Sequence, residues 1–345
     1  MGALSLRFKH KDLLLTGLLL LGVSAVLCGF APDFITMLVS YSVSGLGSAM
    51  ITPMALTLAG TYFSQEARAG AISWIVSGQA LAYLVGTPII GYLAGIGGWR
   101  WAFFGFVLPL SILSLVIAYL KLPTEANEPK QPLSLKNISA GFRGIFSNTS
   151  ANACIIGNVL SMACWTAVLL YSASFNRQNF GASITVASLL LLGGSACYTA
   201  GSFLSGRLVK RFGLKPLTVY CAVAAGVFTI LFTYMPYLWL SSVCAYLGCF
   251  FSGARVSAAN SLAIEQVPGL SGTMMSFNLA ASYLGQSLGG GLGGLVLIVY
   301  GYSGMSFGLG ILGVVAGLVY FFKAIDPTLA QRETRQIFSG NNVAQ

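Results

Sequence analysis

Long apolar runs separated by short polar breaks extend over the whole sequence. Each run is about 20 residues or longer, enough to cross the hydrocarbon core of a bilayer as an α-helix. Glycine, proline, asparagine and charged residues mark the breaks. The predicted spanning helices are 12–31, 34–62, 70–96, 101–121, 151–173, 183–206, 216–234, 238–262, 272–300 and 304–323. The pattern predicts an all-α, polytopic membrane protein with ten transmembrane helices.

One long polar segment, residues 122–150, interrupts this alternation and carries Pro123, Pro129 and Pro132 among mixed charges. Such a composition is typical of a linker between two compact parts. We therefore expect two pseudo-symmetric bundles of four and six helices. The predicted parts are a partial N-terminal bundle (1–121), a cytoplasmic linker (122–150), a C-terminal six-helix bundle (151–324) and a cytoplasmic tail (325–345).

The composition excludes an ordinary soluble protein. Hydrophobic residues make up 56% of the chain and charged residues 8%, with a mean hydropathy of +0.81, whereas about a quarter of the residues in soluble domains are charged. The net charge of +10 is spread over short loops rather than gathered on one face, which disfavours nucleic-acid binding. The seven cysteines lie in apolar runs without CxxC spacing, so neither a metal nor another cofactor is expected.

The basic residues also predict the orientation of the chain. Lysine and arginine accumulate in cytoplasmic loops of membrane proteins. If both termini are cytoplasmic, only Arg100 and Arg177 lie on the far side, and only Arg255 falls deep inside an apolar run. We expect a multi-pass protein of the plasma or inner membrane with both termini in the cytoplasm.

A basic motif links the two halves. GRLVKRFGLK at residues 206–215 is matched in weaker form by GALSLRFKHK at residues 2–11. A further glycine-proline pattern lies in the run 70–96. The motif residues are Gly2, Arg7, Lys11, Gly86, Pro88, Gly91, Gly206, Arg211, Gly213 and Lys215.

On these motifs the chain resembles the major facilitator superfamily, and within it the drug and metabolite exporters. The resemblance implies that the chain begins at the end of the family's second helix and lacks the first two. It also implies that the motif arginines pair with acids at the cytoplasmic surface, Arg7 with Glu66 and Arg211 with Glu265. The acidic position of the family motif is occupied here by Leu6 in one copy and Lys210 in the other, so the second pair is expected to be the better formed.

Polar and aromatic residues within the apolar runs are the candidates for a substrate cavity. They are Tyr41, Ser44, Ser48, Gln79, Asn158, Ser161, Trp165, Tyr198, Arg255, Asn278 and Gln286. For each residue other than Arg255, a hydrogen bond between helices is the competing interpretation. Arg255 is either a substrate or coupling charge in the cavity, or a structural arginine bonded to backbone carbonyls near a helix end.

The predicted function is efflux of a small amphipathic organic molecule by alternating access, because the polar lining is sparse. The alternatives are a degenerate, non-transporting ten-helix protein and a lipid-handling carrier or scramblase. An enzyme is not expected, since the only histidine, His10, lies in a basic loop. The expected partners are the substrate and the lipid bilayer, with the protein a monomer. A coupling proton is the remaining possible partner. The sequence places no carboxylate at mid-membrane that could carry it.

Overall fold

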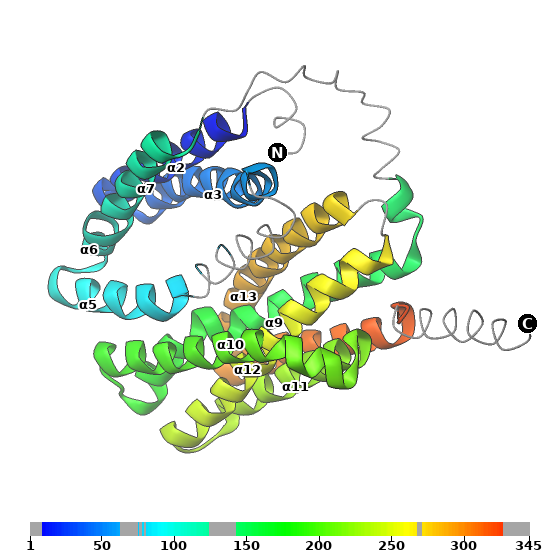
Figure 1. Ribbon diagram of the computed structural model, residues 1–345. Helices are drawn as coiled ribbons and strands as arrows, with labels where there is room; N and C mark the ends of the chain where they lie inside the picture. Colours follow the sequence, from blue (N-terminus) through cyan, green and yellow to red (C-terminus); the bar gives the residue numbers. More distant parts are fainter. Residues whose placement is uncertain are drawn as a thin grey trace, which may run out of the picture. The chain divides into compact units, whose positions relative to one another are not determined.

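The computed structural model describes residues 9–62, 75, 78, 81–123, 143–267 and 271–326. Regular structure in this part of the chain is helical, without strands (Figure 1). The chain divides into two compact units, residues 1–135 (unit 1) and 136–345 (unit 2). The expectation of an all-α, polytopic membrane fold is confirmed. Most of the predicted linker and tail lies outside the described residues.

Unit 1 is built on a pair of long helices. Its elements are α2 (His10–Phe30), α3 (Phe34–Tyr62), η1 (Ala82–Gly86), α5 (Thr87–Gly97), α6 (Trp99–Ala102), η2 (Phe103–Val107) and α7 (Leu108–Lys121). The core of unit 1 includes Leu14 and Leu18 of α2 and Met54 of α3. A Cβ at Gly47 would lie 2.6 Å from the Gly17 carbonyl oxygen. The two backbones approach closely because both positions are glycine.

Both short π-helices of unit 1 come just before a proline. Pro88 follows η1 and Pro109 follows η2, each at the start of the next α-helix. Proline has no N–H to donate, and its ring crowds the carbonyl four residues earlier, which falls in the preceding π turn. The predicted run 101–121 is therefore one helical segment in three parts, α6, η2 and α7.

The described residues of unit 2 form five long helical elements. They are α9 (Thr149–Phe180), α10 (Ile184–Phe212), α11 (Leu214–Tyr234), α12 (Leu238–Gln266) and α13 (Ser271–Lys323). Side-chain caps define two of the starts: Asn148 accepts hydrogen bonds from the backbone N–H groups of Ser150 and Ala151, and Ser183 accepts one from Val186.

The longest element, α13, consists of two arms. Gly301 has φ 69° and ψ −172°, a conformation outside any helix. At 1.5 Å per residue α13 would be about 80 Å long if straight, far beyond a bilayer core of about 30 Å. We call residues 271–300 the first arm and 302–323 the second arm. They correspond to the predicted runs 272–300 and 304–323.

Seven described helical segments are long and apolar enough to cross a membrane, with α13 counted once. α12 has spanning length but is more polar, since it carries Arg255 and Asn260. Each of the ten predicted runs contains helical residues, although residues 70–80 of the third run lie mostly outside the described part.

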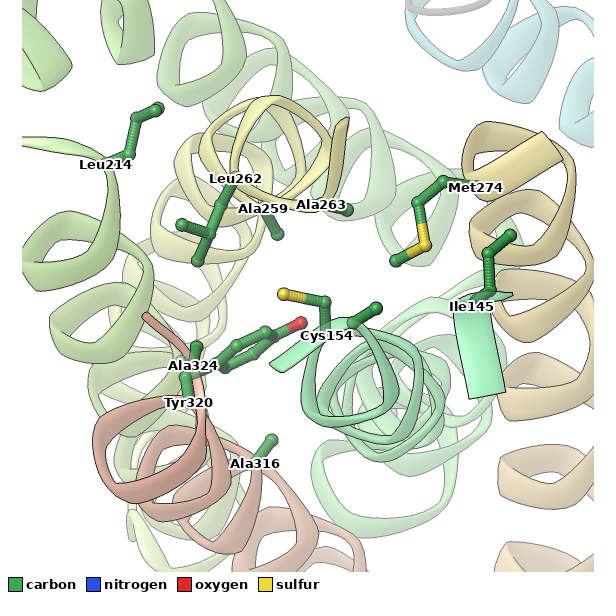
Figure 2. Close-up of a cluster of buried hydrophobic side chains, with 12 residues drawn as sticks. Ile145, Cys154, Leu214, Ala259, Leu262, Ala263, Met274, Ala316, Tyr320 and Ala324 are labelled. Atoms are coloured by element: carbon green, nitrogen blue, oxygen red, sulfur yellow. The ribbon is translucent and has the colours of Figure 1, made fainter. Parts of the chain in front are cut away.

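The core of unit 2 joins α9, α12 and the second arm of α13. Figure 2 shows Cys154, Leu262 and Tyr320 pointing into the same interior space. Ile145, from a helical turn at residues 143–146, is fully buried in this core. The end of the predicted linker segment thus packs against the second bundle.

Candidate functional site

Arg255 is a buried cation in the middle of α12. Its side chain is 1% exposed, and Nη1 donates a hydrogen bond of 3.2 Å to Asn158 Oδ1 on α9. Its Nη2 group has no hydrogen-bond partner. At 1.5 Å per residue Arg255 lies about 16 Å from the Gln266 end of α12, well inside a spanning helix.

No carboxylate lies at this depth among the described residues. The acids in that part of the chain lie at helix ends or in loops: Asp12, Asp33, Glu265 and Asp326. Arg255 is therefore held by a neutral amide, although a charge in the membrane interior costs several kcal/mol when it is not compensated.

Asn158 connects three helices through its amide. While Oδ1 accepts from Arg255, Nδ2 donates to the Asn278 carbonyl oxygen at 2.9 Å and to Ser282 Oγ at 2.8 Å on α13. Asn278 Nδ2 in turn donates to Asn260 Oδ1 on α12 at 2.6 Å. This network fixes α9 and α13 against α12 around the arginine.

Several polar atoms next to this network are left without partners. Tyr320, on the second arm of α13, is fully buried, and its hydroxyl lies close to Arg255 and Ser161, although it forms no hydrogen bond of good geometry with either. Ser161 Oγ and Asn278 Oδ1 are also buried and unpartnered. We call Asn158, Ser161, Arg255, Asn278 and Tyr320 the Arg255 cluster. Most buried polar groups in proteins are satisfied, so four orphaned atoms together are unusual.

A second feature of unit 2 is a small cavity of about 30 Å³ among α9, α10, α11 and α12. We call it the aromatic pocket. Its lining includes Trp165, Ser172, Asn176, Ser195, Phe232 and Tyr246. The Trp165 ring stacks on Tyr198 with centroids 4.7 Å apart. A cavity of this size accommodates at least one water molecule.

Ser241 and Ser242 of the aromatic pocket donate hydrogen bonds to backbone carbonyl oxygens, but three other polar side chains of its lining are free to bind a guest. Ser172, Asn176 and Ser195 are each at least nine-tenths buried. Their side chains make no hydrogen bond within the part of the chain that is described. The pocket therefore combines an aromatic wall with a few unused hydrogen-bonding groups.

Of the cavity candidates from the sequence, the structure brings Asn158, Ser161, Arg255 and Asn278 together in the Arg255 cluster. Trp165 and Tyr198 belong instead to the aromatic pocket and its wall. Gln286 donates to Met162 Sδ at 4.0 Å. Asn158 and Trp165 were candidates for one substrate cavity; the structure assigns them to two separate features.

The candidates in unit 1 remain predictions. The Tyr41 side chain is 57% exposed within its unit. Ser44 Oγ donates to the Tyr41 carbonyl oxygen at 2.7 Å, within its own helix, and Ser48 is half-buried. Gln79 lies outside the described residues.

The expected ion pair between Arg211 and Glu265 is not formed in the structure. Both side chains are exposed, and the Arg211 guanidinium lies 5.4 Å from the centroid of the neighbouring Phe212 ring. An adjacent aromatic face attracts a cation without any ordering of a distant carboxylate. Arg7 and Glu66, the other expected pair, lie outside the described residues, as does Gly2.

The remaining motif residues have structural positions. Gly213 separates α10 from α11 with φ 89°, a value that favours glycine. Lys215 Nζ lies 5.8 Å from the Phe321 ring centroid, and a Cβ at Gly206 would meet nothing within 4 Å.

In unit 1 Lys11 binds the end of another helix. Its Nζ donates to the carbonyl oxygens of Tyr119 at 3.1 Å and Leu122 at 2.6 Å, a favourable place for a cation because carbonyls there lack helical partners. Gly86 ends η1 and lies beside the Phe106 ring. Pro88 lies in the first turn of α5, and Gly91 is half-buried in the same helix.

The sequence analysis missed four residues that complete these features: Asn260, Ser282 and Tyr320 at the Arg255 cluster, and Tyr246 at the aromatic pocket. An asparagine within a spanning run was an available signal for Asn260. Tyr320 lies near the basic end of its run and gave no such signal, because only packing turns its hydroxyl inward.

Comparisons with known proteins agree with this architecture. The family profile described as Major Facilitator Superfamily matches residues 1–179 and 154–341. A probable 4-methylmuconolactone transporter from Cupriavidus pinatubonensis (strain JMP 134 / LMG 1197) is 23% identical over 323 residues, covering 91% of this chain and 74% of the relative. A multidrug resistance protein B homolog from Mycobacterium tuberculosis (strain ATCC 25618 / H37Rv) is 29% identical over 153 residues, 42% of this chain and 27% of the relative.

The fold is similar to that of solved transporters. The crystal structure of a D-xylose-proton symporter matches with a TM-score of 0.70 at 17% identity, covering 93% of this chain and 82% of that chain. A bacterial homolog of the human lysosomal transporter Spinster matches with a TM-score of 0.68 at 19% identity, covering 96% and 85%. At these identities the likeness is one of fold.

Proposed function

The chain belongs to the Major Facilitator Superfamily, and we propose that it exports a small amphipathic organic molecule across the cell membrane. As a member of that family it is a multi-pass secondary transporter and not an enzyme. The finer proposal of efflux and of an amphipathic substrate is carried by one observation, the composition of the aromatic pocket.

The aromatic pocket offers much apolar contact and few hydrogen bonds. Trp165, Phe232 and Tyr246 supply rings, while Ser172, Asn176 and Ser195 supply three side chains without partners. A sugar would require many donors and acceptors, whereas a molecule with one apolar body and one or two polar groups matches this lining once the helices move apart and enlarge the cavity of about 30 Å³. The multidrug resistance relative supports the direction of transport.

The proposed mechanism is alternating access by movement of the two units. Such movement requires each unit to behave as a rigid body. In unit 2 a Cβ at Gly201 would clash with the Phe250 carbonyl oxygen, and one at Gly253 with the Tyr198 carbonyl oxygen. Contacts of backbone on backbone between α10 and α12 leave little freedom for these helices to slide. Cytoplasmic termini, a monomeric state and a coupling proton are parts of the same proposal.

Efflux of rhodamine 123 from liposomes that contain the purified protein tests the proposal. We expect saturable efflux, and we expect Trp165→Ala to raise the apparent KM at least about tenfold, because removal of a buried aromatic anchor costs about 2 kcal/mol or more. Trp239→Ala is the matched control, since Trp239 is 66% exposed on α12 and should not affect KM.

The alternatives give different results in the same liposomes. A degenerate, non-transporting protein would give no efflux above that of empty liposomes. A lipid-handling protein would move a fluorescent phospholipid between leaflets but would not transport the dye. Either result would reject the proposal.

A further inference from the structure

The charge of Arg255 has no counter-charge in the part of unit 2 that surrounds it. An arginine side chain stays protonated in proteins, so burial cannot neutralise it. Its one hydrogen bond within the described residues goes to the neutral amide of Asn158. Transfer of an ion into an apolar interior is unfavourable by several kcal/mol unless an opposite charge accompanies it.

We propose that the Arg255 cluster binds a small monovalent anion, either a halide ion or the carboxylate group of an organic molecule. Three hydrogen-bond donors are available to it: Arg255 Nη2, the Ser161 hydroxyl and the Tyr320 hydroxyl. All three lie on side chains that are at least 95% buried, and none has a partner. Because Arg255 is buried, bulk water cannot solvate its guanidinium.

The donor set selects for charge and size. The positive charge of the guanidinium excludes a cation. A phosphate dianion is disfavoured as well, because the single arginine would neutralise only one of its two negative charges. Asn158 Oδ1 is already occupied by Arg255 Nη1, and its Nδ2 by Asn278 and Ser282. The anion is therefore placed on the Nη2 side, where Ser161 and Tyr320 converge, in a position that completes charge-assisted hydrogen bonds.

The residues come from three segments that only the folded unit brings together: Ser161 from α9, Arg255 from α12 and Tyr320 from the second arm of α13. An anion at this point would hold the three helices together. Because it would bind the folded and not the unfolded chain, its binding raises the stability of the protein.

The binding claim is independent of transport. Of the two possible anions, only the carboxylate rests on the proposed function, because a bound carboxylate would be a group of the exported molecule. A resident halide would instead be a structural ion, and the test below separates the two sources.

The experiment measures the melting temperature of the full-length protein in detergent during titration with sodium chloride, sodium bromide or sodium acetate. Sodium sulfate at equal ionic strength is the reference. We expect a saturable rise of about 5 °C with at least one monovalent anion and no comparable rise with sulfate. Stabilisation by halides alone indicates the resident ion; stabilisation by acetate, with competition between acetate and bromide, indicates the carboxylate source.

Variants identify the site. Arg255→Gln should abolish the rise, and Tyr320→Phe and Ser161→Ala should each weaken anion affinity about tenfold. Tyr300→Phe, on the first arm of α13, is the control, because Tyr300 is 73% exposed, and it should keep the wild-type response. If Arg255→Gln does not fold, the anion response of Tyr320→Phe and Ser161→Ala shows whether the anion binds at the Arg255 cluster. The proposal is wrong if the wild type shows no anion-specific rise, or if these variants respond as the wild type does. In either case efflux of rhodamine 123 would be unaffected, so the two proposals fail separately.

Discussion

Arg255 Nη1 on α12 donates a 3.2 Å hydrogen bond to Asn158 Oδ1 on α9, and both side chains are almost completely buried. A neutral amide thus takes the place that a carboxylate would occupy in a buried ion pair. This relationship gives a direct test of the uncompensated charge.

We expect Asn158→Ala to lower the free energy of unfolding by about 1–3 kcal/mol, because it removes the hydrogen bond that the buried Arg255 guanidinium donates to Asn158. Asn158→Asp should be more stable than Asn158→Ala and should lose the response to added anions, since its carboxylate supplies the missing charge. Thermal unfolding with and without sodium chloride measures both effects. Asn152→Ala is the control, because its hydrogen bond to the Phe146 carbonyl oxygen is exposed. An undiminished anion response in Asn158→Asp would contradict the interpretation.

The glycines of α13 should differ sharply in their tolerance of alanine. A Cβ at Gly289 would lie 2.6 Å from the Ala163 carbonyl oxygen on α9, whereas one at Gly291 would meet nothing within 4 Å. We expect Gly289→Ala to destabilise the protein by about 1–3 kcal/mol, since backbone must shift, and Gly291→Ala to be neutral or slightly stabilising. Melting temperatures in detergent measure the difference; equal values would show that α9 and α13 are not in close contact.

Alanine substitutions at Gly301 and Gly308 of α13 should change the stability of the protein in opposite directions. The φ and ψ values of Gly301 are accessible essentially only to glycine, so Gly301→Ala should cost about 1–3 kcal/mol. Gly308 lies in the second arm with open space around it, and Gly308→Ala should stabilise the helix by about 0.5–1 kcal/mol. The measurement is thermal unfolding of both variants. A neutral Gly301→Ala would mean that α13 is continuous.

How much of this arrangement followed from the sequence depends on the kind of interaction. Apolar run length predicted the spanning helices. Arg255 was recognised because a charge in an apolar run is rare. Its partner Asn158 was one of several polar candidates, since helix rotation selects the partner and no local pattern encodes that rotation.

The failures have the same origin. Trp165 follows Asn158 two turns later on α9, yet it stacks on Tyr198 of α10, because a shift of about 10 Å along a helix is enough to change which neighbouring helix receives the side chain. The Arg211–Glu265 pair was inferred from a family motif; the adjacent Phe212 ring offered a nearer contact. Tyr320 was missed because its burial results from the packing of the second arm of α13.

The Asp33 carboxylate should make the stability of the protein depend on pH in the acidic range. Its carboxylate accepts a 2.7 Å hydrogen bond from the backbone N–H of Thr36 at the start of α3, which lowers the pKa of Asp33 below its ordinary value of 3.8. The folded chain therefore favours the ionised form, so this stabilisation is present above about pH 4 and is lost as the pH falls through the lowered value. Melting temperatures between pH 7 and pH 3 should fall less in Asp33→Ala than in the wild type. Glu265→Gln, at an exposed carboxyl of α12, is the control. Parallel curves for wild type and Asp33→Ala would rule out this role.

Counterflow measures most directly whether the protein is a carrier for amphipathic molecules. Liposomes that contain the purified protein are loaded with unlabelled rhodamine 123 and diluted into a trace of radiolabelled rhodamine 123. Alternating access predicts a transient uptake of label above its equilibrium level, because the outward flow of unlabelled dye returns carriers that bind label. We expect this overshoot in the wild type and in Trp239→Ala, and a strongly reduced one in Trp165→Ala. Uptake that reaches only equilibrium, or an overshoot unaffected by Trp165→Ala, would contradict a carrier that binds its substrate in the aromatic pocket.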